Sequence, residues 1–299
     1  MAYQTGNAKN MAELFPQMIT LMKTQGWILD KQGIEPGYDS YTAWYLHHPD
    51  VGYFNFHSWG NVDLSIQAAT GFDGSKTFNQ QPGASGECWV YLGDYNQAIL
   101  SYDLFITSRY CHVVIQGNGN HFYHFGFGTL NKEGTYTGGQ YMYMGYMPAG
   151  YNSGSYPFDH HDTQSGTFVR AELPGETAVN NGWYPFRRGS SRAMGLGAPM
   201  MAGDHPDVLA VESSLSVLGG VLAPVPNAIY ATTSQNTNIR LGVVPDFCLC
   251  HMKGLTPRAK VAVNGEQWMV VPINQLTFTK PTHWDNGTFT YAYAYRISV

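Results

Sequence analysis

The last strand-like segment of the chain, residues 288–297, alternates strictly between two kinds of side chain. One set is large and apolar: Phe289, Tyr291, Tyr293, Tyr295 and Ile297. The other set is small or polar: Thr288, Thr290, Ala292, Ala294 and Arg296. A period of two places these sets on opposite faces of a β-strand. Because each aromatic ring can bury about 150–250 Å², we expect the aromatic face to pack on the chain's own core or on a partner subunit.

A β-hairpin is predicted just before this strand. Residues 259–263 and 266–271 are separated by Asn264-Gly265, a pair that readily adopts the positive φ angles of a type I′ turn. Seven further segments have the alternation, or the β-branched and aromatic content, of strands. These segments are 27–29, 51–56, 61–66, 88–92, 102–106, 112–116 and 122–127. The pattern therefore predicts a mainly β fold.

A single helix is predicted over residues 10–25. Asn10 is suited to cap its N-terminus, with Glu13 at the capping-box spacing, and Gly26 suits the positive φ angle that often follows a helix. The apolar side chains on one helical face are Phe15, Met18, Ile19 and Met22. Pro16 conflicts with this pattern because proline lacks the N–H that a helix interior needs. We therefore expect the helix to start later or to bend at Pro16.

The predicted fold class is mainly β, with antiparallel sandwich- or barrel-like sheets, one N-terminal α-helix and long irregular loops. Residues 71–86 and 158–225 are rich in turn-forming residues. We expect residues 1–225 to form a domain with the N-terminal helix, a β-rich part and an irregular second half. Residues 226–299 would form a C-terminal β-hairpin region, either separate or packed on the same core.

Few charged residues are available to cover the surface of this chain. Charged side chains make up 12% of the 299 residues, about half of the usual share of roughly 25%, whereas aromatic residues make up 14%. The formal net charge of −5 argues against a surface that binds nucleic acid through its phosphates. No apolar run approaches the roughly 20 residues of a membrane helix, and the N-terminus lacks a secretory-signal pattern. A charge-poor surface favours protein partners.

The sequence contains no recognisable catalytic motif. Nucleophile-elbow, zinc-protease and phosphate-loop patterns are absent, so we expect neither enzymatic activity nor a cofactor. The loop formed by Asp159, His160, His161 and Asp162 is a candidate metal site, although a polar loop in water or against a neighbouring subunit is the favoured interpretation. Cys248 and Cys250 would share one face of a strand. For them, buried free thiols are favoured over a metal clip.

Four regions are predicted to contact neighbouring subunits. They are the helix, the alternating C-terminal strand, a basic patch suited to pair with carboxylates, and residues 136–151 of the Tyr-, Gly- and Met-rich tract 136–156. For this tract an adhesive interface is favoured, with a glycan-binding surface and a half-buried sheet face as alternatives. The candidate contact residues are Phe15, Met18, Met22, Tyr141, Tyr143, Tyr146, Arg187, Arg188, Phe289, Tyr291, Tyr293 and Tyr295.

Several segments resemble a family of virion structural proteins from tailed bacteriophages. The matching residues are Gly6-Asn7-Ala8-Lys9-Asn10, Gln25-Gly26-Trp27, the run from Tyr102 to Ile115, Phe125-Gly126-Phe127-Gly128, Tyr156-Pro157-Phe158 and the closing segment 259–299. In that family a short helix leads into Gly-Trp and a strand, and an aromatic and an apolar strand flank a Ser-Arg turn. Within 111–124, Cys111 and the turn 117–120 depart from a more uniformly apolar and basic stretch in the family.

The resemblance implies a component of the tail or the head–tail neck, present as a ring of copies and made in the host cytoplasm. Its partners would be itself and other virion proteins, such as tail tube, sheath, connector or baseplate subunits. The resemblance supplies no catalytic residues. The alternative function is a receptor- or glycan-binding module at the tail tip or baseplate.

Overall fold

The structure of the protein, a computed structural model, describes residues 1–35, 41–59, 63–91, 101–117, 122–145, 167–175, 182–185, 225–232, 238–251, 255–272 and 291–298. In this part of the chain one α-helix accompanies three antiparallel sheets, which we call the N-terminal, central and C-terminal sheets. The predicted class, mainly β with antiparallel sheets and one N-terminal helix, is confirmed. None of the sheets in the described residues closes into a barrel.

The helix α1 spans Met11–Lys23 and begins where the sequence predicts. The Asn10 side chain caps it by accepting a hydrogen bond from the Glu13 N–H (3.0 Å), and Gly26 follows with a φ angle of 89°. The predicted later start at Pro16 is wrong, because this proline lies inside the helix. Pro16 removes only the bond to the Ala12 carbonyl, and both residues are exposed, so water can bind that carbonyl.

The N-terminal sheet is a meander whose strands pair in chain order. Its strands are β2 (Ile28–Ile34), β3 (Tyr41–His48), β4 (Gly52–Trp59), β5 (Asp63–Ala69) and β6 (Glu87–Tyr91). The segment between β5 and β6 contains the short 3-10 helix η1 (Phe78–Gln80). Strands β2 and β6 are the two edges of this sheet.

The central sheet follows the order β1-β7-β8-β9-β11-β12-β13. Its strands are β1 (Ala2–Gly6), β7 (Ser101–Ile106), β8 (Tyr110–Gln116), β9 (Phe122–Thr129), β11 (Thr137–Gly145), β12 (Thr167–Glu172) and β13 (Trp183–Pro185). The N-terminal strand β1 pairs with β7 from the middle of the chain. The chain therefore returns to its own beginning after completing the N-terminal sheet.

The C-terminal sheet follows the order β10-β15-β18-β17-β16, and β14 also pairs with β15. Its strands are β10 (Asn131–Lys132), β14 (Val225–Thr232), β15 (Asn238–His251), β16 (Ala259–Val263), β17 (Glu266–Pro272) and β18 (Tyr291–Ser298). The predicted hairpin is confirmed as β16 and β17. Its turn residues Asn264 and Gly265 have φ angles of 52° and 85°, as a type I′ turn requires.

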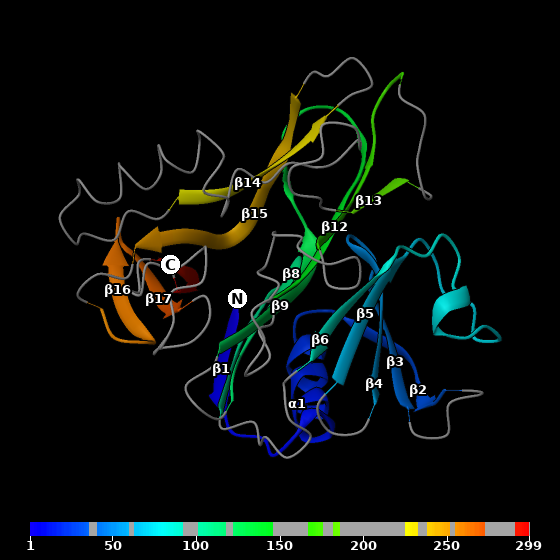
Figure 1. Cartoon of the computed structure of the whole chain (residues 1–299), viewed down its shortest axis with the longest axis horizontal. Helices are drawn as coiled ribbons and strands as arrows, with labels where there is room; N and C mark the ends of the chain where they lie inside the picture. Colours follow the sequence, from blue (N-terminus) through cyan, green and yellow to red (C-terminus); the bar gives the residue numbers. More distant parts are fainter. Residues whose placement is uncertain are drawn as a thin grey trace, which may run out of the picture.

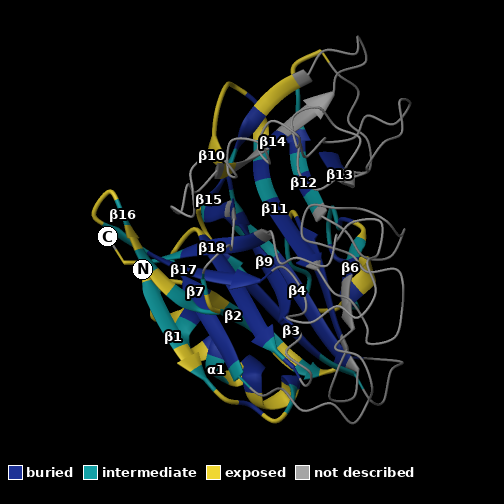
Figure 2. Cartoon of the chain, turned by 60° about the vertical axis from the view of Figure 1, so that its left-hand side comes forward, coloured by how far each residue is buried: buried dark blue, intermediate teal, exposed yellow. Residues whose placement is uncertain are grey.

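The central sheet is covered on both faces. One face, with Leu104, Val113 and Phe125 among its residues, shares a core with α1 and the N-terminal sheet. The opposite face shares a second core with the C-terminal sheet, in which Tyr293 and Tyr295 take part. Figure 1 shows the N-terminal strands in blue and cyan on one side of the green central strands, with the orange C-terminal strands on the other. Buried residues, dark blue in Figure 2, run through the strands of these layers.

Candidate functional site

The predicted contact residues that the structure describes lie inside the chain's own cores. Phe15, Met18 and Met22 are buried beneath the N-terminal sheet, and Tyr141 and Tyr143 are buried in the central sheet. The aromatic strand likewise packs on the core, because its buried rings Tyr293 and Tyr295 face the central sheet. These side chains therefore cannot contact a neighbouring subunit in this fold, which corrects the expectation from the sequence. Residues 141–144 of the tract are buried within β11, so this part of the tract offers neither a glycan-binding surface nor an adhesive one.

Other predicted site residues lie outside the described part of the chain. They are Asp159, His160, His161, Asp162, Tyr146, Arg187, Arg188, Phe289 and the side chain of Tyr291. Within the described residues, no three His, Cys, Asp or Glu side chains come together as a metal site. Cys248 and Cys250 are buried free thiols, as the favoured interpretation of the sequence has it. Burial raises the pKa of the Cys248 thiol to about 12.

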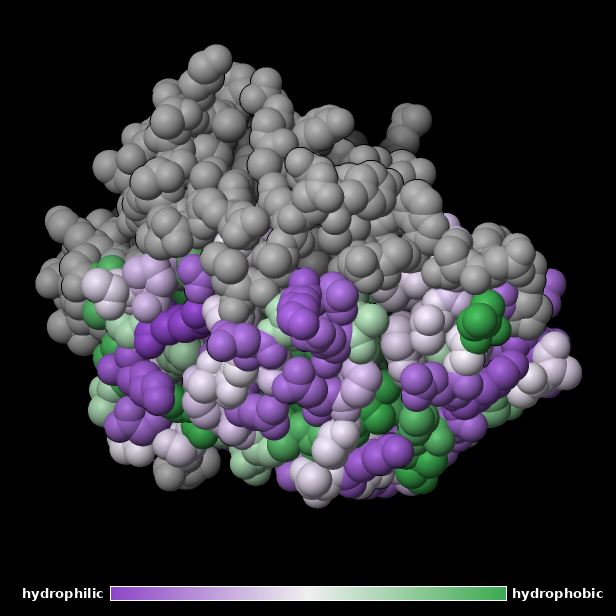
Figure 3. All heavy atoms as spheres, turned by 90° about the horizontal axis from the view of Figure 1, so that it is seen from below, coloured by the Kyte–Doolittle hydropathy of each residue, from purple (hydrophilic) through white to green (hydrophobic). Residues whose placement is uncertain are grey.

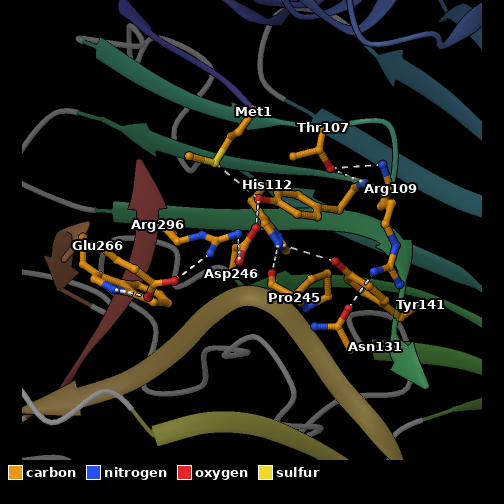
Figure 4. A network of polar contacts seen from close by, with 12 residues as sticks. Met1, Thr107, Arg109, His112, Asn131, Tyr141, Pro245, Asp246, Glu266 and Arg296 are labelled. Atoms are coloured by element: carbon orange, nitrogen blue, oxygen red, sulfur yellow. Dashed lines mark hydrogen bonds and ion pairs between the residues drawn. The ribbon is translucent and has the colours of Figure 1, made fainter. Parts of the chain in front are cut away.

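A seam of polar side chains lies where β15 crosses the central sheet. Ala228 of β14 pairs with Val243, but Pro226 pairs with Cys248, so β15 contains several extra residues, a β-bulge, between these two pairs. Asp246 lies in this bulge with a φ angle of 56°, which is uncommon for a residue with a side chain. The bulge directs the Asp246 carboxylate and the Pro245 carbonyl toward the central sheet (Figure 4).

The Asp246 carboxylate joins three strands from two sheets. Its Oδ2 accepts a hydrogen bond from the Tyr110 hydroxyl of β8, and its Oδ1 lies 2.7 Å from Nη2 of Arg296 in β18. Nη1 of Arg296 lies 2.7 Å from Oε1 of Glu266 in β17. Burial, and then the negative charge of Asp246, raise the pKa of the Tyr110 phenol, so it remains a hydrogen-bond donor. Figure 4 shows this chain of contacts running from Glu266 to the central sheet.

Two histidine–tyrosine pairs continue the seam. Nε2 of His112 lies 3.0 Å from the Pro245 carbonyl, and Nδ1 lies 2.8 Å from the Tyr143 hydroxyl. His124 makes the equivalent contacts, at 2.8 Å to the Pro272 carbonyl and 2.7 Å to the Tyr295 hydroxyl. A carbonyl can only accept, so each imidazole donates its Nε2–H there. Burial lowers the pKa of His112 to about 4, so this ring is neutral near pH 7 and accepts the Tyr143 O–H at Nδ1. Each pair therefore ties the central sheet to the C-terminal sheet.

A glycine makes room for the first of these pairs. Gly126 of β9 is the register partner of both His112 and Tyr143, on the strands to either side. A Cβ atom at Gly126 would lie 2.7 Å from Nδ1 of His112 and 2.7 Å from the Tyr143 ring. Both side chains therefore occupy the space above Gly126, where they meet across the intervening strand.

Replacing Gly126 with alanine is expected to lower the free energy of unfolding by about 1–3 kcal/mol, the usual cost of overpacking a tight core. The added methyl group would push the imidazole and the phenol apart. Urea unfolding followed by tryptophan fluorescence measures this change. Gly33→Ala is the matched control, because no atom lies within 4 Å of a Cβ placed there. Equal stability of the two variants would contradict the tight packing of this pair.

A second polar connection joins the two sheets at Arg258, which precedes β16. Its Nε lies 2.7 Å from Oδ2 of Asp103 in β7, and its Nη1 donates to the side chain of Gln116 in β8. Asp103 also accepts a hydrogen bond from the Tyr3 hydroxyl of β1 (3.2 Å). The Asp103 side chain is only 1% exposed, so Arg258 neutralises a carboxylate that lies within the core.

The seam uses its polar groups to connect sheets. Tyr110, His112, His124, Asp103 and Asp246 all bond to groups of the same chain. Sequence reasoning missed this seam. The signal available was weak: a histidine in each of two adjacent strand segments, and tyrosines that alternate along two others.

Comparison with known proteins does not assign a family to the chain. No protein-family model matches the chain, and no curated protein matches it. The helix of the described part is not long and apolar enough to cross a membrane.

Proposed function

We propose that this chain is a non-enzymatic structural subunit of a tailed-bacteriophage virion. It assembles with copies of itself as a ring in the neck or collar or in the tail, beside subunits of the tube, sheath, connector or baseplate. The sequence resemblance supports a role in the virion and assembly of the chain as a ring. The observation that supports assembly from the structure is the exposed edge strand β2.

Strand β2 combines an edge that has no strand partner among the described residues with exposed apolar side chains. It pairs with β3 on one side, and no other described strand pairs with it. None of its residues is buried. Ile28 and Ile34 are 44% and 67% exposed, and they are two of the four large apolar residues exposed in the described part. Figure 3 views the molecule from below, the side where β2 and α1 lie in Figure 1, and shows apolar residues exposed among polar ones.

We assign a second copy of the chain as the partner that binds at the β2 edge. An open edge strand is a template for pairing with another chain. The bulge between Leu29 and Lys31 and the charge of Lys31 limit strand addition along this edge. In a ring each copy contributes two different surfaces, and β2 would provide one of them.

Replacing both isoleucines of β2 with serine is expected to shift the purified protein from an assembly to single chains. The change removes exposed apolar surface and leaves the core untouched, so the fold should persist. Light scattering coupled to size-exclusion chromatography measures the mass. Ile239→Ser is the matched control, because Ile239 is also exposed, at 38%, but lies on β15. A double variant with the same mass as the unmodified chain would exclude β2 as the contact.

A further inference from the structure

A compact loop lies on the outer face of the N-terminal sheet, the face that points away from α1. It consists of residues 70–82, between β5 and β6, and contains η1, which packs on β4. Its two ends meet, because the Thr70 N–H donates to the Pro82 carbonyl (2.9 Å). Figure 1 shows the loop in cyan at the right of the molecule, with η1 as a short coiled ribbon. A loop of this length whose ends lie together is an Ω-loop, a class that often carries a function.

The loop is bonded to itself through the side chain of Gln81. The Gln81 Nε2 group donates to the carbonyls of Asp73 (3.1 Å), Lys76 (3.0 Å) and Thr77 (3.2 Å). Its Oε1 accepts from the Asp73 N–H (2.9 Å). Gln81 is 3% exposed, so these bonds form the interior of the loop. Because donors and acceptors all belong to the loop, the bonds can persist while the loop leaves the sheet.

Phe78 of η1 is the main anchor of the loop on the sheet. It is the one apolar residue of 70–82 that is buried. Its ring stacks on the His57 imidazole with the ring centres 4.2 Å apart. Its N–H donates to Oε1 of Glu35, and Oε2 of the same carboxylate accepts from the Tyr45 hydroxyl (2.8 Å). The buried Glu35 carboxylate therefore latches the loop to the sheet.

Two further contacts lie at the rim of the loop. Nζ of Lys31 donates to the Gly74 carbonyl (3.0 Å), and the Phe72 ring lies 5.3 Å from the Tyr45 ring. Neither Lys31 nor Phe72 is buried. Water competes for the first contact and the second is partly open to solvent, so both add little to the anchor at Phe78.

The sheet surface beneath the loop is polar and incompletely hydrogen-bonded. Phe54 and Phe56 of β4 face the core, so the residues that alternate with them face outward. These are Asn55 and His57, and Gln67 of β5 is the register partner of Asn55. Nδ2 of Asn55, Nδ1 of His57 and Oε1 of Gln67 have no hydrogen-bond partner among the described residues, which are 1%, 8% and 5% exposed. Burying an unpaired polar group costs free energy, so water that reaches this surface offsets part of the cost of opening the loop.

We propose that the loop 70–82 is a lid that opens as one unit while the sheet beneath it stays folded. Opening breaks the contacts of Phe78 with Glu35 and His57 and keeps the bonds of Gln81. The lid separates one buried apolar side chain from the sheet, whereas global unfolding exposes both large cores, so opening costs far less. Opening does not require assembly of the chain, so this proposal and the proposed function are tested separately.

Hydrogen–deuterium exchange on the full chain tests the lid, with mass spectrometry and electron-transfer fragmentation to resolve single amides. The protection factor of the Phe78 amide is expected to be at least about tenfold below those of the β8 amides, because β8 lies in the centre of a buried sheet. The Asp73 amide, which bonds to Gln81 inside the loop, is expected to remain more protected than the Phe78 amide. This order distinguishes a lid that moves as one unit from a loop that unravels.

Two variants weaken the anchor. Glu35→Gln removes the charge and leaves one oxygen for two donors, so the amide of residue 78 is expected to exchange about tenfold faster. Phe78→Ala removes the buried ring and is expected to accelerate exchange of the same amide by a similar factor. Neither variant should change exchange in β8.

Ile106→Val is the matched control, because it trims a buried side chain of β7 far from the loop. It should accelerate exchange in β8 and leave the Phe78 amide unchanged, since the lid opens without global unfolding. Equal protection of Phe78 and β8 in the unmodified chain would overturn the proposal. A Phe78 amide that responds to Ile106→Val but not to Glu35→Gln or Phe78→Ala would overturn it too. An Asp73 amide less protected than that of Phe78 would exclude movement as one unit.

Discussion

Replacing Arg258 with methionine is expected to lower the free energy of unfolding by about 3–5 kcal/mol, the usual cost of leaving one partner of a buried ion pair unpaired. Asp103 is 1% exposed and lies 2.7 Å from the Arg258 guanidinium. Among the described residues, its carboxylate then keeps only the hydrogen bond from the Tyr3 hydroxyl. Methionine retains much of the length of the arginine side chain, so the loss reports on the charge and on the hydrogen bond to Gln116 rather than on packing. Urea unfolding at neutral pH measures it.

The control is the double variant Asp103→Asn with Arg258→Met. Asparagine removes the negative charge and keeps an oxygen for the Tyr3 hydroxyl, so most of the lost stability should return. The double-mutant cycle then gives the coupling energy between the two side chains. A loss below about 1 kcal/mol in the single variant, as for a surface ion pair, would show that the pair contributes little to holding the sheets together.

Lowering the pH from 7 to 4 is expected to cost the protein about 3 kcal/mol of stability through His112 alone. Burial lowers the pKa of this imidazole from its ordinary value of 6.5 to about 4. The folded state therefore holds His112 neutral where the unfolded chain binds a proton. Its contribution is fully present above pH 6.5 and is lost as the pH falls toward 4. Urea unfolding across this range measures the loss.

The control for this pH dependence is His112→Phe, which keeps the ring volume and removes the titrating group. Its stability at neutral pH should be lower, because the Pro245 carbonyl and the Tyr143 hydroxyl lose their partner. Its stability should also decline less between pH 6.5 and 4 than that of the unmodified chain. A His112 NMR resonance that titrates near pH 6.5 in the folded protein would contradict this prediction.

The local structure was predictable because it depends on neighbouring residues. Asn264-Gly265 has few turn geometries open to it, and Asn10 with Glu13 marks the start of α1. The alternation of residues 292–297 also holds in the fold. Tyr293 and Tyr295 face one core, and Ala292 and Ala294 face another.

The sequence does not predict which element packs on each face of a strand, because this packing joins residues that lie far apart in the chain. The aromatic face of β18 requires burial, but the sequence does not distinguish a neighbouring subunit from the central sheet. The polar seam was not predictable for the same reason. His112 meets Pro245 across a sequence separation of 133 residues, and Arg258 meets Asp103 across 155. The bulge that presents Asp246 has no local motif that would identify it.

The small share of charged residues also has a cause inside the fold. The central sheet is buried on both faces, so its strands need apolar residues at successive positions rather than at alternate ones. In β8, for example, the six residues 110–115 are all buried. The low charge therefore does not by itself indicate partners, and the assembly proposal depends on the edge strand β2 and on the sequence resemblance.

The mass of the purified, unmodified chain in solution tests the assembly proposal most directly. We predict one predominant species whose mass is a whole-number multiple, greater than one, of a single 299-residue chain. Light scattering over a range of protein concentrations measures it. A single chain at every concentration would contradict self-assembly and leave β2 as an ordinary exposed edge.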